Sequence, residues 1–295
     1  AWLGERLGHY FSSPPGAFDG QKLAAAVALS RRFCLIAGGP GTGKTTTVVK
    51  VLALLREWGR RNGLRQRIAM AAPTGKAAAR LAQAIRSALL HDPAIDSRLA
   101  AGISSDVTTV HRLLGPLPGS TRFRHTADNP LSCDILLIDE ASMLDLGLMA
   151  QLLSALRPHA RLILLGDRDQ LPSVGVGQVL QDLFASLPQA DATDGLSYSP
   201  PQRQLLERLC AFELPAAAEG EPGVGDGIAL LRRSYRFTAD SGIGELAAAV
   251  KAGDASAARG LLQRAGKANA DDLERLSPDP GSEAWLEKLA APYLE

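Results

Sequence analysis

Short apolar runs recur along the chain, and each is followed by a glycine-rich or acidic turn and then by a longer segment with helical spacing. Near-continuous apolar runs are typical of strands that are buried on both faces of a parallel sheet. We predict strands at Phe33–Ala37, Ile68–Ala72, Ile135–Ile138 and Leu162–Leu165. We predict helices at 45–59, 75–90, 145–157 and 177–187. This alternation predicts an α/β fold in which a parallel sheet is flanked by helices.

The segment 188–227 interrupts the pattern, because it holds five prolines, five glycines and an alanine tract. Only Gln202–Phe212 shows helical spacing within it. We therefore predict that 188–227 is a flexible insertion that leaves the sheet and contains one short helix. The pattern returns at Ile228–Phe237, and further helices are expected at 242–252, 254–265 and 282–291.

The composition is that of an ordinary globular protein. The 295 residues, of which 46% are hydrophobic and 21% charged, are enough for one large domain or two modest ones. The formal net charge of +1 excludes the strong overall positive field by which histone-like proteins bind nucleic acid. Any nucleic-acid binding by this chain therefore needs a local surface.

The sequence gives no sign of membrane insertion or secretion. It holds no run of about 18 uncharged apolar residues, and Glu5 and Arg6 stand where a signal peptide needs its apolar stretch. The three cysteines lie far apart, so neither a disulfide framework nor a zinc cluster is expected. These features favour a cytoplasmic protein without a membrane partner. Because the chain begins with Ala1 and ends without an obvious stop signal, we expect a piece of a longer protein.

A glycine-rich segment directly after the first predicted strand matches the spacing Gly-x4-Gly-Lys-Ser/Thr and leads into a helical pattern. Glycines let successive backbone N–H groups turn toward phosphate oxygens, and the following helix presents its positive end to the same anion. Lys44 would reach the β- and γ-phosphates, and the Thr45 hydroxyl would bind Mg²⁺. The alternative is a glycine-rich turn that binds nothing. The predicted nucleotide-binding residues here are Gly38, Gly39, Pro40, Gly41, Thr42, Gly43, Lys44, Thr45 and Thr46.

Acidic and amide side chains follow two further predicted strands. Asp139 and Glu140 end the run Ile135–Ile138, and Gln170 lies in the polar cluster after Leu162–Leu165. Ligands of open α/β sheets collect at the carboxyl ends of the strands, so these groups are expected beside the phosphate loop. Asp139 would hold Mg²⁺, Glu140 would polarise the attacking water, and the Gln170 amide would sense the γ-phosphate. The alternatives are solvated acids at a helix start and a capped turn.

Six segments together, in this order and spacing, carry a family resemblance. They are Gly38–Thr45, Ala72–Ala78, Thr109–Gly115, Asp139–Ser142, Gly166–Leu171 and Ser234–Phe237. The chain resembles superfamily 1 DNA helicases, and within them the RecD family, the alpha subunits of bacterial exodeoxyribonuclease V, over roughly residues 14–263. The resemblance implies a RecA-like P-loop NTPase domain, built as a three-layer sandwich, that uses ATP and Mg²⁺. It further implies a 5′→3′ DNA helicase that acts with RecB- and RecC-like subunits on DNA in double-strand break repair and recombination.

The resemblance also assigns roles to residues outside the phosphate loop. Gln21 is similar to the glutamine that reads the adenine edge, Tyr235 to the aromatic residue that stacks on the base, and Arg236 to the arginine that neutralises the γ-phosphate. Without the family, Gln21 would be a solvated residue at a helix start, and Tyr235 and Arg236 an unremarkable pair. The residues expected to contact single-stranded DNA are Pro73, Thr74, Gly75, Lys76, Thr109 and His111, although His111 fits a structural histidine as well.

These inferences divide the chain into four regions: a motor domain with the nucleotide site at 1–187, the insertion at 188–227, the end of the motor domain at 228–265, and the start of a following region at 266–295. No motif of a second RecA-like domain follows residue 265, so we expect weak ATP hydrolysis from this fragment alone. Two functional hypotheses stay open: a DNA-translocating ATPase, and an ATP-binding assembly subunit that clamps partners without unwinding. A GTPase is disfavoured because the Asn-Lys-x-Asp guanine-reading motif does not occur.

Overall fold

The computed structural model describes residues 2–14, 16–167, 170, 177, 179–185, 197–214, 221–235 and 241–264. The chain divides into two compact units, residues 1–233 and 234–295. Arg236, the predicted helix at 282–291 and the region 266–295 lie outside the described residues.

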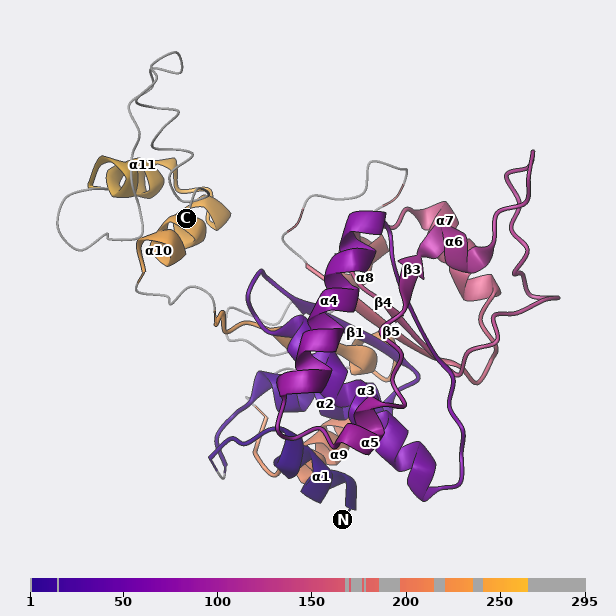
Figure 1. Cartoon of the computed structure of the whole chain (residues 1–295). Coiled ribbons are helices and arrows are strands. Elements are labelled where there is room, and N and C mark those ends of the chain that lie inside the picture. The colour runs from indigo at the N-terminus through magenta and orange to yellow at the C-terminus, as the bar shows by residue number, and fades with distance from the viewer. Residues whose placement is uncertain are drawn as a thin grey trace. The chain divides into compact units, whose positions relative to one another are not determined.

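The first unit is built on one sheet in which all paired strands are parallel (Figure 1). In the described residues its order is β3-β2-β4-β5-β1-β6. The strands are β1 (Phe33–Gly38), β2 (Ile68–Ala72), β3 (Val107–Thr109), β4 (Ile135–Ile138), β5 (Arg161–Gly166) and β6 (Ile228–Leu231). The four predicted strands are confirmed. The sheet also gains β3 at one edge, which the sequence pattern missed because only three residues are extended there.

Helices cover both faces of the sheet, and each face has its own hydrophobic core. Along β1, Cys34 and Ile36 pack into one core, whereas Leu35 and Ala37 pack into the other. The first core includes residues of α1 (Trp2–Tyr10), α2 (Gly20–Ser30), α3 (Lys44–Arg61), α4 (Gly75–His91) and α9 (Pro200–Cys210). The second includes residues of α6 (Val110–Leu114), α7 (Leu146–Ser154) and α8 (Val179–Ala185). The predicted three-layer, RecA-like P-loop fold is therefore confirmed.

Polar side chains fix where the helices begin. Asp19, Thr74, Thr109 and Asp145 each precede a helix and accept a hydrogen bond from a backbone N–H of its first turn. Such caps satisfy donors that the helix itself leaves unpaired. Short helices complete the unit at α5 (Ser97–Ala100) and at the 3-10 turns η1 (Ala141–Met143) and η2 (Val224–Gly227).

Within the predicted insertion at 188–227, the structure describes residues 197–214 and 221–227, and α9 is the short helix expected at Gln202–Phe212. The helix α9 packs against α1 and α2, and its Leu206 and Cys210 are buried in the first core. Asp226 in η2 is fully buried and binds Ser199 and Arg31. Pro200 and Pro201 begin this helix, where their missing N–H groups cost nothing.

The second unit begins at Ser234, so the division of the chain falls earlier than the predicted boundary at 265. It contains α10 (Gly242–Lys251) and α11 (Ala255–Arg264), which pack against each other and confirm the helices expected at 242–252 and 254–265. None of the helices that the structure describes, in either unit, combines the length and apolar character that crossing a membrane requires.

Candidate functional site

The carboxyl ends of the parallel strands meet at one edge of the sheet, and most of the predicted site residues follow them there. In sheet order, Thr109 ends β3, Pro73 follows β2, Asp139 follows β4, Asp167 follows β5 and the phosphate loop follows β1. Ladder pairing sets Ala72 opposite Thr109, so the two predicted DNA-contacting segments are neighbours. In this strand order, the ends of β3 and β2 lie on one side of β4 and the phosphate loop lies on the other. Asp139 and Glu140, which follow β4, lie between them.

The phosphate loop joins β1 to α3 and has the backbone shape that an anion site requires. Gly41 and Gly43 have φ values of 75° and 80°, a left-handed conformation that glycine adopts without strain. Gly43 precedes α3 and gives that helix no side-chain cap, so the N–H groups of the first turn stay available to a ligand. The buried Thr42 hydroxyl donates to the Gly39 carbonyl at 2.9 Å and braces the turn.

Gly38 is required by close packing at the base of the loop. A Cβ atom there would lie 2.6 Å from the Thr42 hydroxyl oxygen, 2.7 Å from the Leu231 carbonyl oxygen and 2.9 Å from Leu231 Cβ. Two of these three atoms belong to the neighbouring strand β6. The loop therefore starts at a residue, Gly38, whose backbone packs directly against β6 and leaves no room for a side chain.

The ammonium group of Lys44 lies over its own loop. Its Nζ donates to the carbonyl of Gly38 and, at 3.1 Å, to the carbonyl of Gly39. Because both acceptors are neutral carbonyls, they do not neutralise the positive charge of the ammonium. An incoming phosphate would offer the same group anionic acceptors, which make stronger hydrogen bonds.

Asp139 follows β4 at the same edge of the sheet. Its backbone N–H donates to the Ala71 carbonyl at 3.0 Å, and its Oδ1 accepts from the Glu140 N–H at 2.9 Å. Burial raises the pKa of the Asp139 carboxyl, and the Glu140 charge adds to that rise. The Glu140 N–H and the Lys44 ammonium act in the opposite direction. The Lys44 charge therefore favours the ionised form of the Asp139 carboxyl.

Glu140 has a backbone conformation that is unusual for its residue type. Its φ of 52° and ψ of 39° lie in the left-handed region, which costs a side chain with a Cβ about 1–2 kcal/mol. Strain of this kind persists where the surroundings demand it, and it clusters at functional sites. The turn directs the chain from β4 into η1 and leaves the Glu140 side chain half-buried.

Gln170 is tied to the segment that follows Glu140. The Ser142 hydroxyl donates to Gln170 Oε1 at 3.3 Å, so the amide that was predicted to sense the γ-phosphate lies beside the acidic turn. Asp167, at the end of β5, is 4% exposed and makes further interactions. Asp167 belongs to the motif Gly166–Leu171, but the motif alone assigns it no role. Its position directly after an apolar strand, like that of Asp139, was the available signal.

Gln21 reaches the phosphate loop from α2. Asp19 caps this helix and accepts from the N–H groups of Gln21 at 2.9 Å and Lys22 at 3.0 Å. The Gln21 side chain donates through Nε2 to the Thr42 carbonyl at 3.3 Å. The structure therefore brings Gln21 to the nucleotide loop, while its expected contact with adenine stays a prediction.

The predicted DNA-contacting residues line the start of two helices. Thr74 caps α4 by accepting from Ala77 N–H, and Thr109 caps α6 by accepting from Arg112 N–H, both at 3.2 Å. Gly75 and Lys76 are exposed, and Pro73 is half-buried. The His111 ring is exposed and lies against Phe123, with centroids 5.8 Å apart. That contact fits both a structural and a DNA-binding histidine.

Two predicted residues are not joined to this site by the structure. Tyr235 is 60% exposed but belongs to the second unit, and Arg236 lies outside the described residues. Thr46 is on the exposed side of the first turn of α3, and Thr45 beside it is half-buried. The expected roles of these residues therefore stay predictions.

A protein-family model described as AAA domain matches residues 21–176, which is more than half of the chain and includes the whole loop and both acids. The chain belongs to the AAA domain family. The chain is 40% identical over 278 residues to the RecBCD enzyme subunit RecD of Mycolicibacterium smegmatis. That alignment covers 94% of this chain and 42% of the relative. It is 38% identical over 254 residues to the RecBCD enzyme subunit RecD of Haemophilus influenzae, covering 85% of this chain and 38% of the relative.

A third relative is the ATP-dependent RecD2 DNA helicase of Deinococcus radiodurans, 40% identical over 162 residues, with 55% of this chain and 19% of the relative covered. The resemblance to RecD that the motifs indicated is thus confirmed. The AAA domain chain spans about two fifths of the length of the RecD relatives that it matches.

Proposed function

We propose that this chain carries the nucleotide-binding motor domain of an ATP-dependent DNA helicase that works 5′→3′ as a subunit of a RecBCD-type complex. One observation supports the proposal above the others. The phosphate loop, Lys44 and Asp139 converge at the carboxyl edge of a parallel sheet, where their charges act on each other. The similarity to proteins named RecD and RecD2 DNA helicase supports the DNA-dependent part of the proposal.

In this proposal ATP binds with its phosphates in the loop between β1 and α3. The free N–H groups at the start of α3 donate to phosphate oxygens, and Lys44 exchanges its two carbonyl acceptors for oxygens of the β- and γ-phosphates. Glu140 takes the proton of a water whose oxygen attacks the γ-phosphorus. The bond between that phosphorus and the bridging oxygen of ADP breaks at the same time. Gln170 positions this water or reports the γ-phosphate.

Thr45 and Asp139 fit a role in holding Mg²⁺. A hydroxyl and a carboxylate are oxygen ligands of the kind that this ion prefers. Among the described residues, His, Cys, Asp and Glu side chains form no group of three that could hold a metal by themselves. Mg²⁺ commonly takes one or two protein oxygens together with phosphate oxygens and water, so this sparse set suits it. When bound, the ion neutralises phosphate charge, and a nearby cation favours the charged form of the Asp139 carboxyl.

Three further roles belong to the proposal. Gln21 reads the adenine edge from its place beside Thr42, Tyr235 stacks on the base, and Arg236 neutralises the γ-phosphate. Closure between the unit 1–233 and a second motor domain then couples hydrolysis to movement along DNA. The hydrogen bond between Gln21 and the loop supports the first of these roles.

Single-stranded DNA lies along the β3–β2 side of the same edge. The backbone N–H groups at the start of α4, the Lys76 ammonium, and the Thr109 and His111 side chains offer donors to phosphate oxygens. Each phosphate that is contacted on a single strand adds about 0.7 to the salt dependence of binding. Because only a few such contacts hold the strand, the protein can release the DNA in every cycle of ATP hydrolysis. RecB- and RecC-like subunits are the proposed protein partners.

ATP hydrolysis by the full-length protein tests the proposal. Lys44→Ala should abolish DNA-stimulated hydrolysis, and Glu140→Gln should keep ATP binding while hydrolysis and unwinding are lost. Glu213→Gln, which makes the same change at an exposed position, should leave all three unchanged. Undiminished hydrolysis by Lys44→Ala would refute the proposed site. Unwinding by Glu140→Gln at the rate of the unchanged protein would refute the role of Glu140. ATP binding without unwinding by either protein would favour the clamping subunit over the motor.

A further inference from the structure

The end of α3 that lies away from the phosphate loop has a surface of its own. The helix from Lys44 to Arg61 is 18 residues long, which is about 27 Å at about 1.5 Å per residue. Two cavities open beside this end of the helix. We call the residues that line them the α3-end surface. It cannot contact a nucleotide that is bound at the start of the same helix.

One of the two cavities is lined by arginines. Its volume is about 510 Å³, and its lining consists of Arg56, Arg60, Leu64, Arg65, Arg98 and Ala101. No acidic residue is among them. Of the ion pairs formed within the described part of the chain, none involves these four guanidinium groups. Four unpaired cations around one hollow repel each other, and an acidic ligand would relieve that repulsion.

The helix end explains only part of this cluster. Cations are favoured near the last carbonyls of a helix, which accounts for Arg60. Arg65 and Arg98 come from the loop after α3 and from α5 instead. Arg56 is fixed at the base of the hollow, because its Nη1 donates to the Gln66 carbonyl at 2.8 Å and its guanidinium packs against Gly102. The arginines are therefore presented by three separate elements.

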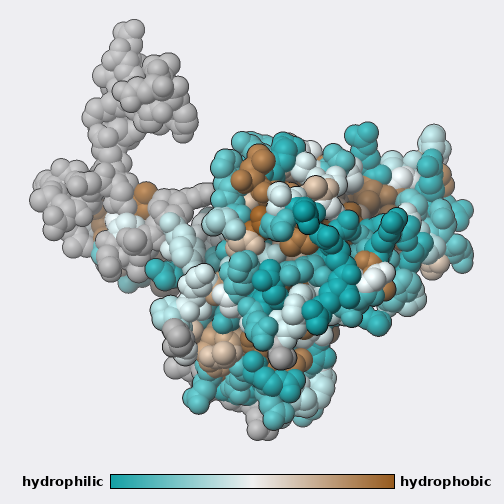
Figure 2. Space-filling view, turned by 60° about the horizontal axis from the view of Figure 1, so that its bottom comes forward, coloured by the Kyte–Doolittle hydropathy of each residue, from teal (hydrophilic) through white to brown (hydrophobic). Residues whose placement is uncertain are grey.

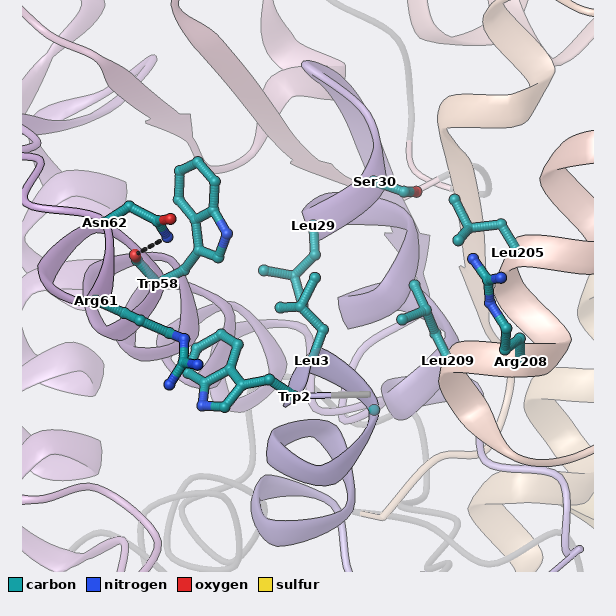
Figure 3. Close-up of a pocket in the computed structure, with 11 residues that line it drawn as sticks. Trp2, Leu3, Leu29, Ser30, Trp58, Arg61, Asn62, Leu205, Arg208 and Leu209 are labelled. Atoms are coloured by element: carbon teal, nitrogen blue, oxygen red, sulfur yellow. Dashed lines mark hydrogen bonds between the residues drawn. The ribbon is translucent and has the colours of Figure 1, made fainter.

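The second cavity, of about 500 Å³, is mainly apolar (Figure 3). It is lined chiefly by Trp2, Leu3, Leu29, Trp58, Leu205 and Leu209. In Figure 3, Leu3 and Leu29 approach each other between the two tryptophans and α9. Arg61 and Arg208 complete the rim, and Arg61 lies 5.3 Å from the Trp2 ring centroid. Like the first cavity, this one has no acidic residue in its lining.

The chemistry of the two cavities selects one class of occupant. Tryptophan and arginine are the residues that most often dominate the binding energy of protein interfaces, and sockets lined by leucine accept apolar side chains. A nucleic acid would match the charge but not the leucine-lined socket. The arginine hollow itself has no aromatic ring on which a base could stack. A protein segment that carries both carboxylates and apolar anchors matches both cavities.

We propose that the α3-end surface docks an acidic segment of a partner protein, with an apolar side chain in the Trp2–Trp58 socket and carboxylates against the arginines. This inference rests on the proposed function, which makes the chain a subunit of a larger complex. The α3-end surface is then the face of this chain that binds a partner subunit. Figure 2 is turned so that the bottom of Figure 1, where α1, α5 and α9 lie, comes forward, and it shows hydrophobic patches among hydrophilic residues.

Charge reversal at the exposed arginines tests the inference. The full-length protein is titrated with the RecB- and RecC-like subunits of the same organism, and binding is compared between Arg60→Glu/Arg98→Glu and the matched control Arg86→Glu/Arg122→Glu. All four side chains are exposed, so neither pair should unfold the protein. The first pair should raise the Kd for the partner at least about tenfold. The control pair should change it less than about twofold, and Arg60→Lys/Arg98→Lys should restore most of the affinity.

The same variants are measured for melting temperature, for affinity to single-stranded oligothymidine and for DNA-stimulated ATP hydrolysis. Partner binding that is unchanged in Arg60→Glu/Arg98→Glu overturns the inference. A loss of oligothymidine affinity in its place would make the surface a DNA track, and a loss of melting temperature would make the occupant another part of the same chain. Either result overturns it. Failure of the proposed function is separate, because it would appear as hydrolysis by Lys44→Ala or as no subunit binding by the unchanged protein.

Discussion

Asp226 carries the largest stability effect that we expect from a single substitution. Its carboxylate is fully buried, and Oδ2 accepts from Arg31 Nη2 at 2.5 Å and from the Ser199 hydroxyl at 2.7 Å. Oδ1 accepts from the Ser199 N–H at 2.8 Å. These bonds join α2, the start of α9 and the turn before β6. They connect positions that are as many as 195 residues apart in the sequence.

Asp226→Ala removes the acceptor from three donors at once. Breaking a buried ion pair by removing one partner costs about 3–5 kcal/mol of unfolding free energy. Because the Arg31 side chain is 39% exposed, water can solvate its freed charge, and we expect a value near the lower end, about 3 kcal/mol. For a chain of this size, about 2–4 °C is lost per kcal/mol. The melting temperature should therefore fall by about 6–12 °C.

Thermal unfolding followed by circular dichroism measures this effect. Asp226→Asn keeps one oxygen acceptor but loses the charge, so it should fall between the unchanged protein and Asp226→Ala. Asp128→Ala, at an exposed position, is the matched control and should melt within about 1 °C of the unchanged protein. A fall of less than about 2 °C for Asp226→Ala would refute the reasoning, because it would mean that the buried carboxylate contributes almost nothing to the fold.

Three further predictions concern the nucleotide site. Gly38→Ala should weaken ATP binding at least about tenfold in calorimetry and cost about 1–3 kcal/mol of stability, because its Cβ would lie within 2.9 Å of Thr42 and Leu231; unchanged affinity would argue against the close packing. In the absence of nucleotide and at neutral pH, the melting temperature of Asp139→Asn should be higher than that of the unchanged protein. The pKa of Asp139 is raised in the fold from an ordinary value of 3.8, so its stabilising contribution is complete below that value and is lost as pH rises through the folded pKa. The difference should vanish in acid, and a lower melting temperature at pH 7 would contradict it. Glu140→Gly should relieve the left-handed strain and stabilise the protein by about 1 kcal/mol while hydrolysis is lost; equal or lower stability would show that the strain is absent.

The elements with strong local signals could be predicted from the sequence. The strands Ile68–Ala72 and Ile135–Ile138 have the bounds that their apolar runs predicted, because buried parallel strands need no alternation and end where polar residues begin. The phosphate loop and Asp139 were found because glycine spacing and an acid at a strand end are local features. Parallel pairing of the strands then brings them to one edge.

The features that the sequence analysis missed depend on contacts between distant residues. The packing of α9 into the first core, the pairing of Asp226 with Arg31 and the contact between Gln21 and Thr42 join segments whose local patterns are unremarkable. Prolines and glycines in 188–227 suggested an irregular segment, yet its described residues hold a helix that packs into the first core and a buried charge. Such contacts follow from the tertiary arrangement, which local propensity does not encode.

Calorimetric titration of the full-length protein with a non-hydrolysable ATP analogue, with and without Lys44→Ala, tests the proposed nucleotide site most directly. A charged hydrogen bond contributes about 1.5–3 kcal/mol, so loss of the ammonium should weaken binding by about 10- to 150-fold. The substitution is expected to leave the melting temperature of the nucleotide-free protein almost unchanged, because the two carbonyl acceptors of Lys44 lie in a part of the loop that water can reach. Equal affinity of the two proteins for the analogue would contradict the assignment of this loop as the phosphate site.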